Sequence, residues 1–267
     1  MSASIHNAIG IIPARYAAVR FPGKPLALIA GKPMVQHVYE RARCAKNLAR
    51  LAVATDDRRI ADAVEAFGGE AIMTSPDSPS GTDRIVEAVG HLSYDIVVNI
   101  QGDEPILDAG GIDECVAALS ENPDIAVATL AERIVSPDQL IDPNVVKVVN
   151  DFDHNALYFS RSIIPFPRGF EGPDGDMDLE KASKQLLYLK HIGLYAYRRD
   201  ALMKFASMPP SPLEMIEKLE QLRILQSGGK IRIIEVGGRS ASVDTPEDIA
   251  VVERLLSMQS GTQDSSS

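Results

Sequence analysis

The sequence contains little cysteine and no hydrophobic run long enough to cross a membrane. Its two cysteines, Cys44 and Cys115, both fall in helical patterns at positions expected to be buried. Such a pair is typical of a reduced cytoplasmic protein and not of a disulfide scaffold. A membrane span needs about 20 apolar residues, and the opening MSASIHNA has neither the basic nor the apolar region of a signal peptide. We therefore expect a cytoplasmic protein that makes no membrane contact.

Acidic residues are absent before Glu40, although the whole chain carries a formal charge of −10. The same stretch contains Arg15, Arg20, Lys24 and Lys32. A cationic cluster on an acidic protein indicates a local anion such as phosphate, and not general attraction to nucleic acid. A solvated basic loop is the alternative on spacing alone, because the stretch matches neither the Walker loop nor the G-x-G-x-x-G motif.

Short apolar runs alternate with helical patterns in the first half of the chain. Four of these runs have the length and β-branched content of buried strands: 9–12, 51–54, 70–73 and 95–100. The first run is expected to stop at Pro13, which lacks the N–H of a central strand, and a helix is expected to open at Pro33. The alternation predicts βαβ crossovers and a doubly wound, mostly parallel α/β sheet.

The second half of the chain is less regular. Strands are expected at 125–130, 145–149, 156–160, 190–197 and 230–236. The hairpin turn at 151–155 between two of them predicts a small antiparallel excursion in the middle of the chain. A helix is expected from Ser211, with its buried face formed by Leu213, Ile216, Leu219, Leu222 and Leu225. We expect one domain over 1–256 and a disordered tail over 257–267, which is rich in Ser, Gln and Gly.

Polar residues follow the ends of the predicted strands, where α/β sheets bind ligands. Asp103 comes after the run 95–100 and would suit Mg²⁺, which takes one or two carboxylates and completes its shell with water and phosphates. Asp103 could instead cap the next helix, although Asp108 is better placed for that. The segment 80–83 (SGTD) could likewise be no more than a turn and helix N-cap, and Thr245 could cap the last helix.

Several motifs, in order, resemble those of the sugar-activating nucleotidyltransferases, and most closely the cytidylyltransferases that activate 3-deoxy-manno-octulosonate (Kdo). They are IIPARY, RFPGKPL, GKPM, SGTDR, QGDEP, FSR, HIGLYAY and VDTPED. The resemblance runs from about Ile9 to Leu255 and departs most around 169–184. It implies a Rossmann-like nucleotidyltransferase fold and transfer of CMP from CTP to the anomeric hydroxyl of Kdo, with release of pyrophosphate, for lipopolysaccharide synthesis.

The resemblance also implies roles for individual residues in nucleotide and metal binding. The basic loop would hold the triphosphate through Arg15 and Lys24, with Arg20 assisting. The nucleotide-binding set would be completed by Ser80, Gly81, Thr82, Arg84 and Gln101. Asp103 and Asp244 would hold Mg²⁺, and these two carboxylates with Arg15 and Lys24 would be the catalytic residues.

The same resemblance implies a sugar-binding and dimerisation subregion at about 145–200, and a homodimer. Contacts to the ulosonic acid would come from Gln101, Arg161, His191, Tyr195, Glu214 and Gln221. Taken alone, an Arg or His at such positions is usually structural, and Glu214 and Gln221 could lie on a solvated helix face. The sequence does not separate Kdo from its 8-amino analogue or another ulosonic acid.

Two other interpretations compete with a cytidylyltransferase. A metal-dependent glycosyltransferase would normally show D-x-D where this chain has Asp103-Glu104-Pro105. An inactive nucleotide-binding module would have no need of both Asp103 and Asp244.

Overall fold

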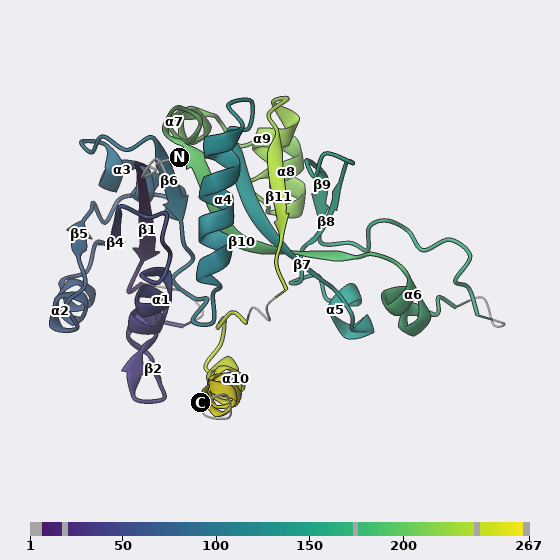
Figure 1. The fold of residues 1–267 in the computed structure, drawn as a ribbon, viewed down its shortest axis with the longest axis horizontal. Helices are drawn as coiled ribbons and strands as arrows, with labels where there is room; N and C mark the ends of the chain where they lie inside the picture. The colour runs from purple at the N-terminus through teal and green to yellow at the C-terminus, as the bar shows by residue number, and fades with distance from the viewer. Residues whose placement is uncertain (1–6, 18–20, 173–175, 238–240, 264–267) are drawn as a thin grey trace. The chain divides into compact units, whose positions relative to one another are not determined.

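A computed structural model describes residues 7–17, 21–172, 176–237 and 241–263 of the chain. The chain divides into two compact units, 1–116 with 239–267, and 117–238 (Figure 1). The second unit contains the 145–200 subregion expected from the sequence. None of the helices described is both long and apolar enough to cross a bilayer.

The first unit is built on a parallel sheet with strand order β6-β1-β4-β5. The strands are β1 (Ala8–Ala14), β4 (Arg50–Thr55), β5 (Ala71–Met73) and β6 (Ile96–Asn99). The crossovers between them carry α1 (Met34–Ala42), α2 (Arg58–Ala66) and α3 (Gly81–Val89). Strand β1 is an inner strand of this sheet and belongs to the hydrophobic core, where Ile9, Ile11 and Ile12 are completely buried. The predicted α/β fold is confirmed.

The first strand does not end at Pro13 as expected, because β1 continues to Ala14 beside β4. Its pairing with β6 ends at Ile11, whose carbonyl accepts the N–H of Ile100 at 2.9 Å. Backbone groups two residues apart point to the same side of a strand. The nitrogen of Pro13 therefore points to the side where pairing has already ended, and its missing N–H costs no ladder bond.

The basic loop after β1 contains two short elements that the sequence did not predict. They are the 3-10 helix η1 (Lys24–Leu26) and a hairpin of β2 (Leu28–Ile29) with β3 (Lys32–Pro33). The two turn residues, Ala30 and Gly31, have φ of 48° and 81°, as a tight two-residue hairpin requires. Helix α1 consequently starts at Met34, with Pro33 as its N-cap.

The second unit has a mixed sheet. Its strands are β7 (Val127–Arg133), β8 (Lys147–Asn150), β9 (Ala156–Ser160), β10 (Leu189–Arg198) and β11 (Ile231–Glu235). Strand β11 runs parallel to β7, whereas β10 is antiparallel to β7 and β8, and β8 forms a hairpin with β9. Its helices include α5 (Pro137–Ile141), α6 (Leu179–Gln185) and α7 (Arg199–Ser207). The antiparallel excursion therefore lies in the middle of the chain, as predicted.

The helix expected from Ser211 is two short helices, α8 (Pro212–Glu217) and α9 (Leu222–Gln226). Lys218 ends the first of them in the left-handed conformation, with φ of 55°. This break interrupts the apolar periodicity, so Ile216, expected in the core, is 77% exposed. Glu214 is buried in its place as part of a capping box with Ser211.

Two further observations concern the ends of helices. The last helix, α10 (Asp248–Gln263), begins after Thr245 and extends through most of the segment expected to be disordered. Residues 264–267 of that segment lie outside the described part of the chain. Cys44 is exposed beyond the end of α1, whereas Cys115 is buried in α4 (Ala109–Glu121), which leads from the first unit into the second.

Candidate functional site

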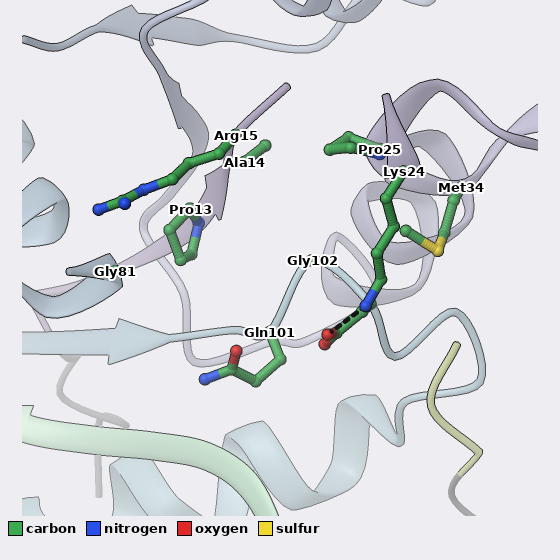
Figure 2. Close-up of a pocket in the computed structure, with 10 residues that line it drawn as sticks. Pro13, Ala14, Arg15, Lys24, Pro25, Met34, Gly81, Gln101 and Gly102 are labelled. Carbon is green, nitrogen blue, oxygen red and sulfur yellow. Dashed lines mark hydrogen bonds and ion pairs between the residues drawn. The ribbon is translucent and has the colours of Figure 1, made fainter. Parts of the chain in front are cut away.

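A cavity of about 340 Å³ lies at the carboxyl end of β1, in the first unit (Figure 2). It is lined by Pro13, Ala14, Arg15, Lys24, Pro25, Met34, Gly81, Gln101, Gly102 and Asp103. These residues come from the end of β1, the basic loop, the starts of α1 and α3, and the loop after β6. The cavity is therefore at the sheet edge where a parallel α/β fold brings strand ends together.

Lys24 joins the two carboxylates that were expected to act together. Its Nζ lies 2.8 Å from Oδ2 of Asp103 and 3.5 Å from Oδ1 of Asp244. The Lys24 side chain is 13% exposed, whereas those of Asp103 and Asp244 are 33% and 46% exposed. The ammonium group therefore compensates two carboxylates that remain open to solvent on their other sides.

Backbone geometry explains why carboxylates so distant in sequence converge. The N–H of Val243 donates to the carbonyl of Asp103 at 2.9 Å, which places Asp244 beside the loop after β6. That loop passes close to β1, since a Cβ on Gly102 would lie 3.0 Å from the carbonyl oxygen of Pro13. Only glycine allows this approach without displacing the backbone.

Asp248 shapes the turn that carries Asp244. Its Oδ2 accepts the N–H groups of Asp244 at 2.9 Å and Thr245 at 2.8 Å. Burial by itself raises the pKa of Asp248, but the hydrogen bonds from Thr245 and Asp244 outweigh it and leave the pKa below its usual value. The carboxylate of Asp248, three residues after Thr245, thus supplies one half of a capping box around the expected cap residue.

The donor set of Asp103 and Asp244 is compatible with Mg²⁺, which binds one or two carboxylates and keeps water or phosphate oxygens as its other ligands. In the described part of the chain, no three His, Cys, Asp or Glu side chains converge to hold a metal by themselves. A cation at this pair would therefore depend on additional oxygen ligands from solvent or substrate.

Arg15 reaches a different part of the cavity from Lys24 (Figure 2). Its Nη2 donates to the carbonyl oxygen of Ser78 at 2.5 Å, which directs the guanidinium toward the start of α3. Gln101 also lines the cavity. Arg20, expected to assist, lies outside the described residues.

The SGTDR segment divides into residues that face the cavity and residues that support it. Gly81 lines the cavity, whereas Ser80 and Asp83 form the capping box of α3 and Thr82 is buried. The alternative prediction, that this segment caps a helix, is therefore confirmed for Ser80. Arg84, also expected to bind nucleotide, is completely buried: it donates to Thr74 and lies 3.1 Å from Asp56. Its contacts make it a support of the loop between β5 and α3.

In the second unit, His191 and Tyr195 belong to a row of aromatic rings on β10. The ring of His191 lies 5.1 Å from Phe159 and 5.3 Å from Tyr195. Burial lowers the pKa of His191 to about 3, so the ring is neutral at physiological pH. Thr129 Oγ1 lies 3.0 Å from Nε2 and donates to the carbonyl of Leu194 at 2.7 Å. Which of Thr129 Oγ1 and Nε2 donates to the other depends on the tautomer of the ring.

Tyr195 and Gln221 each have a buried polar atom that makes no well-formed hydrogen bond, although the hydroxyl of Thr129 interacts with that of Tyr195. These atoms are the hydroxyl of Tyr195 and Nε2 of Gln221. Buried polar groups are rarely left unpaired in folded proteins, so both are candidates for contact with a ligand or an ordered water. Burial raises the pKa of Tyr195, and the nearby carboxylate of Glu220 contributes to the same shift. Glu220 is thus a carboxylate near the tyrosines that the sequence did not single out.

Arg161 and Glu214 make contacts with other residues of the second unit. Arg161 donates to the carbonyls of Glu217 at 2.7 Å and Pro143 at 2.8 Å. Glu214 forms a two-pronged ion pair with Arg223, at 2.7 and 2.5 Å, and this pairing lowers its pKa. Arg–carboxylate forks of this kind are strong structural links. The geometry gives both residues a structural function.

Tyr16 and Arg59 are two further residues near the basic loop that sequence reasoning missed. The guanidinium of Arg59 stacks 3.4 Å from the centre of the Tyr16 ring. Gly23, with φ of 73°, lies close to the same ring, since a Cβ at this position would be 3.3 Å from the Tyr16 side chain. Its N–H also donates to the carbonyl of Tyr16 at 2.8 Å. The contact with Tyr16 fixes Gly23, the residue just before Lys24. The only sequence signal for this contact was the motif IIPARY, which ends in Arg-Tyr.

The chain resembles proteins of known name over nearly its full length. A family model described as cytidylyltransferase matches residues 9–233. The 3-deoxy-manno-octulosonate cytidylyltransferase of Geobacter sulfurreducens is 53% identical over 251 residues, which cover 93% of this chain and 99% of that protein. The protein of the same name from Solibacter usitatus is 47% identical, with 93% and 94% covered.

Solved structures show the same relationship. The structure of CMP:2-keto-3-deoxy-manno-octonic acid synthetase complexed with CTP matches with a TM-score of 0.85 and 45% identity, covering 94% of this chain and 99% of that one. A 4-diphosphocytidyl-2C-methyl-D-erythritol synthase from Anaerococcus prevotii has a TM-score of 0.62 at 12% identity, which indicates a shared fold alone.

Proposed function

The chain belongs to the cytidylyltransferase family, and we propose that it transfers CMP from CTP to the anomeric hydroxyl of Kdo. The hydroxyl oxygen attacks the α-phosphorus in line, the bond from that phosphorus to the bridging oxygen breaks, and pyrophosphate leaves. The products are CMP-Kdo and pyrophosphate, in keeping with a place in lipopolysaccharide synthesis. Full-length similarity to relatives of that name, one of them solved with CTP, supports both substrates.

The convergence of Asp103 and Asp244 on Lys24, which lines the cavity, is the observation that carries this proposal. Phosphoryl-type transfer depends on positioning and on neutralising charge, and needs no covalent nucleophile on the enzyme. Lys24 is a cation that can pair with phosphate oxygens, and Arg15 presents a guanidinium in the same cavity. We assign these two residues to the triphosphate.

We further propose that Asp103 and Asp244 hold Mg²⁺ when nucleotide is bound. Both carboxylates lie within 3.5 Å of one cationic atom, so they can share a small cation. A bound Mg²⁺ would lower the pKa of the attacking hydroxyl and shield the α-phosphate. Lys24 would then pair with phosphate in exchange for one of its present carboxylate contacts.

For the sugar acid, we propose that residues of β10 and the segment before α9 make the contacts. The ring of His191 is neutral, and the buried hydroxyl of Tyr195 and Nε2 of Gln221 make no well-formed hydrogen bond. These groups suit the hydroxyls of a sugar. The contacts of Arg161 and Glu214 argue for support of this region and against direct binding.

We also propose that the protein is a cytoplasmic homodimer. The second unit exposes several large apolar side chains, which an interface between copies would cover: Val135, Ile141, Leu157, Phe166 and Leu187. Light scattering coupled to gel filtration would measure the molar mass directly. A monomer at the concentrations used for activity assays would contradict the dimer without affecting the proposed reaction.

A pyrophosphate-release assay tests the reaction. The purified protein is given each of the four nucleoside triphosphates with Kdo, its 8-amino analogue or another ulosonic acid, with and without Mg²⁺. We expect release only when CTP, an ulosonic acid and Mg²⁺ are all present. Release without an acceptor, or transfer of sugar from a nucleotide sugar, would contradict the proposal, and the second result would favour the glycosyltransferase interpretation.

A further inference from the structure

Helix α3 holds the loop between β5 and α3 by two of its side chains, three positions apart. Arg84 donates to Thr74 at the start of the loop. Glu87 accepts the N–H of Ser75 at 2.7 Å through Oε1 and the hydroxyl of Ser78 at 2.7 Å through Oε2. Residues three apart lie on the same side of a helix, so the loop is fixed along one edge of α3.

The far side of this loop contacts the cavity described above. Ser78 receives Arg15 Nη2 on its carbonyl oxygen and gives its hydroxyl proton to Glu87. A continuous chain of hydrogen bonds therefore runs from the exposed carboxylate of Glu87 to a guanidinium in the cavity. The hydrogen bonds from Ser78 and Ser75 lower the pKa of Glu87, in keeping with an ionised carboxylate in this chain.

Arg15 depends on this loop for its direction. Ser78 O is its only hydrogen-bond partner among the residues described, so Nε and Nη1 stay available for an anion. A long, flexible side chain loses entropy when it is ordered by a ligand, and ordering it beforehand lowers that cost. A displaced Ser78 would leave Arg15 free to adopt other rotamers.

We propose that Glu87 is a positioning residue that fixes Arg15 for nucleotide binding by holding Ser78 in place. This inference rests on the proposed function, because it takes Arg15 as a ligand of CTP. Glu87 touches no substrate and acts only through Ser78. It therefore sets the affinity for CTP and leaves the acceptor unaffected.

Steady-state kinetics of Glu87→Ala test the proposal. We expect the KM for CTP to rise about 5- to 10-fold, because Arg15 is no longer ordered before CTP binds, with kcat and the KM for Kdo within twofold of wild type. Ser78→Ala removes the same contact and should reproduce the result. The matched control is Glu65→Ala, which removes an exposed glutamate of the neighbouring helix α2 that is paired only with Arg58 among its described contacts.

A double-mutant cycle separates positioning from a general structural effect. In an Arg15→Ala background, Glu87→Ala should raise the KM for CTP no further, because its target is gone. The proposal would be overturned if Glu87→Ala raised the KM for CTP equally in the wild-type and Arg15→Ala backgrounds. It would also be overturned if Glu87→Ala did not raise this KM in the wild-type background. If Arg15→Ala alone leaves the KM for CTP unchanged, the positioning role falls as well, whereas pyrophosphate release by the wild type would still support the proposed reaction.

Discussion

Charged residues are used differently in the two units. In the first, Lys24, Asp103 and Arg15 line an open cavity, and Lys24 pairs with carboxylates that keep solvent-facing surface. In the second, Arg161 donates to backbone carbonyls and Glu214 is paired with Arg223. Arg15, Lys24, Asp103 and Arg161 all lie in motifs that carry the resemblance described above. The difference shows that a charged residue in a motif can serve either the substrate or the scaffold.

Lys147 in the second unit is the extreme case of a scaffold charge. Its side chain is completely buried, and Nζ donates to the carbonyls of Asp142, Val145 and Arg161 at 2.6–2.9 Å. Burial lowers its pKa. Its three hydrogen bonds join the segment 142–145 to the carbonyl of Arg161, so this lysine organises the backbone around Arg161.

The largest effect is expected from the carboxylates of the first unit. Asp103→Asn and Asp244→Asn should each lower turnover by on the order of 10³ or more while leaving thermal unfolding nearly unchanged. Because the two would act as a unit, the double variant should be barely worse than either single one. Asp62→Asn, an exposed change on α2, serves as the control. Losses that multiply independently would show that the carboxylates do not share one cation.

Lys24→Ala should have the next largest effect. It removes the cation between Asp103 and Asp244, and we expect turnover to fall by roughly 10²–10³, the magnitude for losing a group that stabilises transition-state charge. Lys32→Ala, at an exposed lysine of the same basic stretch, should leave turnover near wild type. If Lys24→Ala turned over CTP at the wild-type rate, the basic loop would be an ordinary solvated surface without a role in the reaction.

Arg161→Lys probes the second unit. Lysine keeps the charge but loses the planar fork, so it cannot contact the carbonyls of Pro143, Glu217 and Lys218 together, and the free energy of unfolding should fall by about 1–3 kcal/mol. Urea denaturation measures this, with the exposed Arg168→Lys as control. A higher KM for Kdo without any loss of stability would give Arg161 the acceptor role that its sequence motif implied, and would break the contrast between the units.

The smallest effect concerns His191 and pH. Its pKa is about 3 in the folded protein and about 6.5 when unfolded, so the unfolded chain takes up the proton first as pH falls. The stabilising contribution is complete above about pH 6.5 and decreases toward pH 3, by at most about 1.4 kcal/mol per pH unit. Urea denaturation between pH 7 and 5 should show a shallower dependence for His191→Gln than for wild type. Equal slopes would mean that the ring is protonated without cost in the fold.

Local patterns in the sequence predicted most of the fold. The alternation of apolar runs with helical periodicity predicted the parallel sheet, and the placement of Asp108 as a helix cap was confirmed by its bond to the N–H of Gly110 at 2.9 Å. The hairpin at Ala30–Gly31 escaped prediction because alanine rarely adopts positive φ. The break at Lys218 escaped it for the same reason, since nothing in the residue type marks a left-handed lysine.

The sequence by itself determined which strand ends carry charge, because a strand and the loop after it are set by neighbouring residues. Only the tertiary structure decided which charges face a cavity. Asp244 lies beside Lys24 because the N–H of Val243 donates to the carbonyl of Asp103. Arg84, in contrast, is buried and forms an ion pair with Asp56. Burying a charge is favourable only where a distant segment supplies a counter-charge or a carbonyl, and such partners are brought together by folding and not by the order of residues.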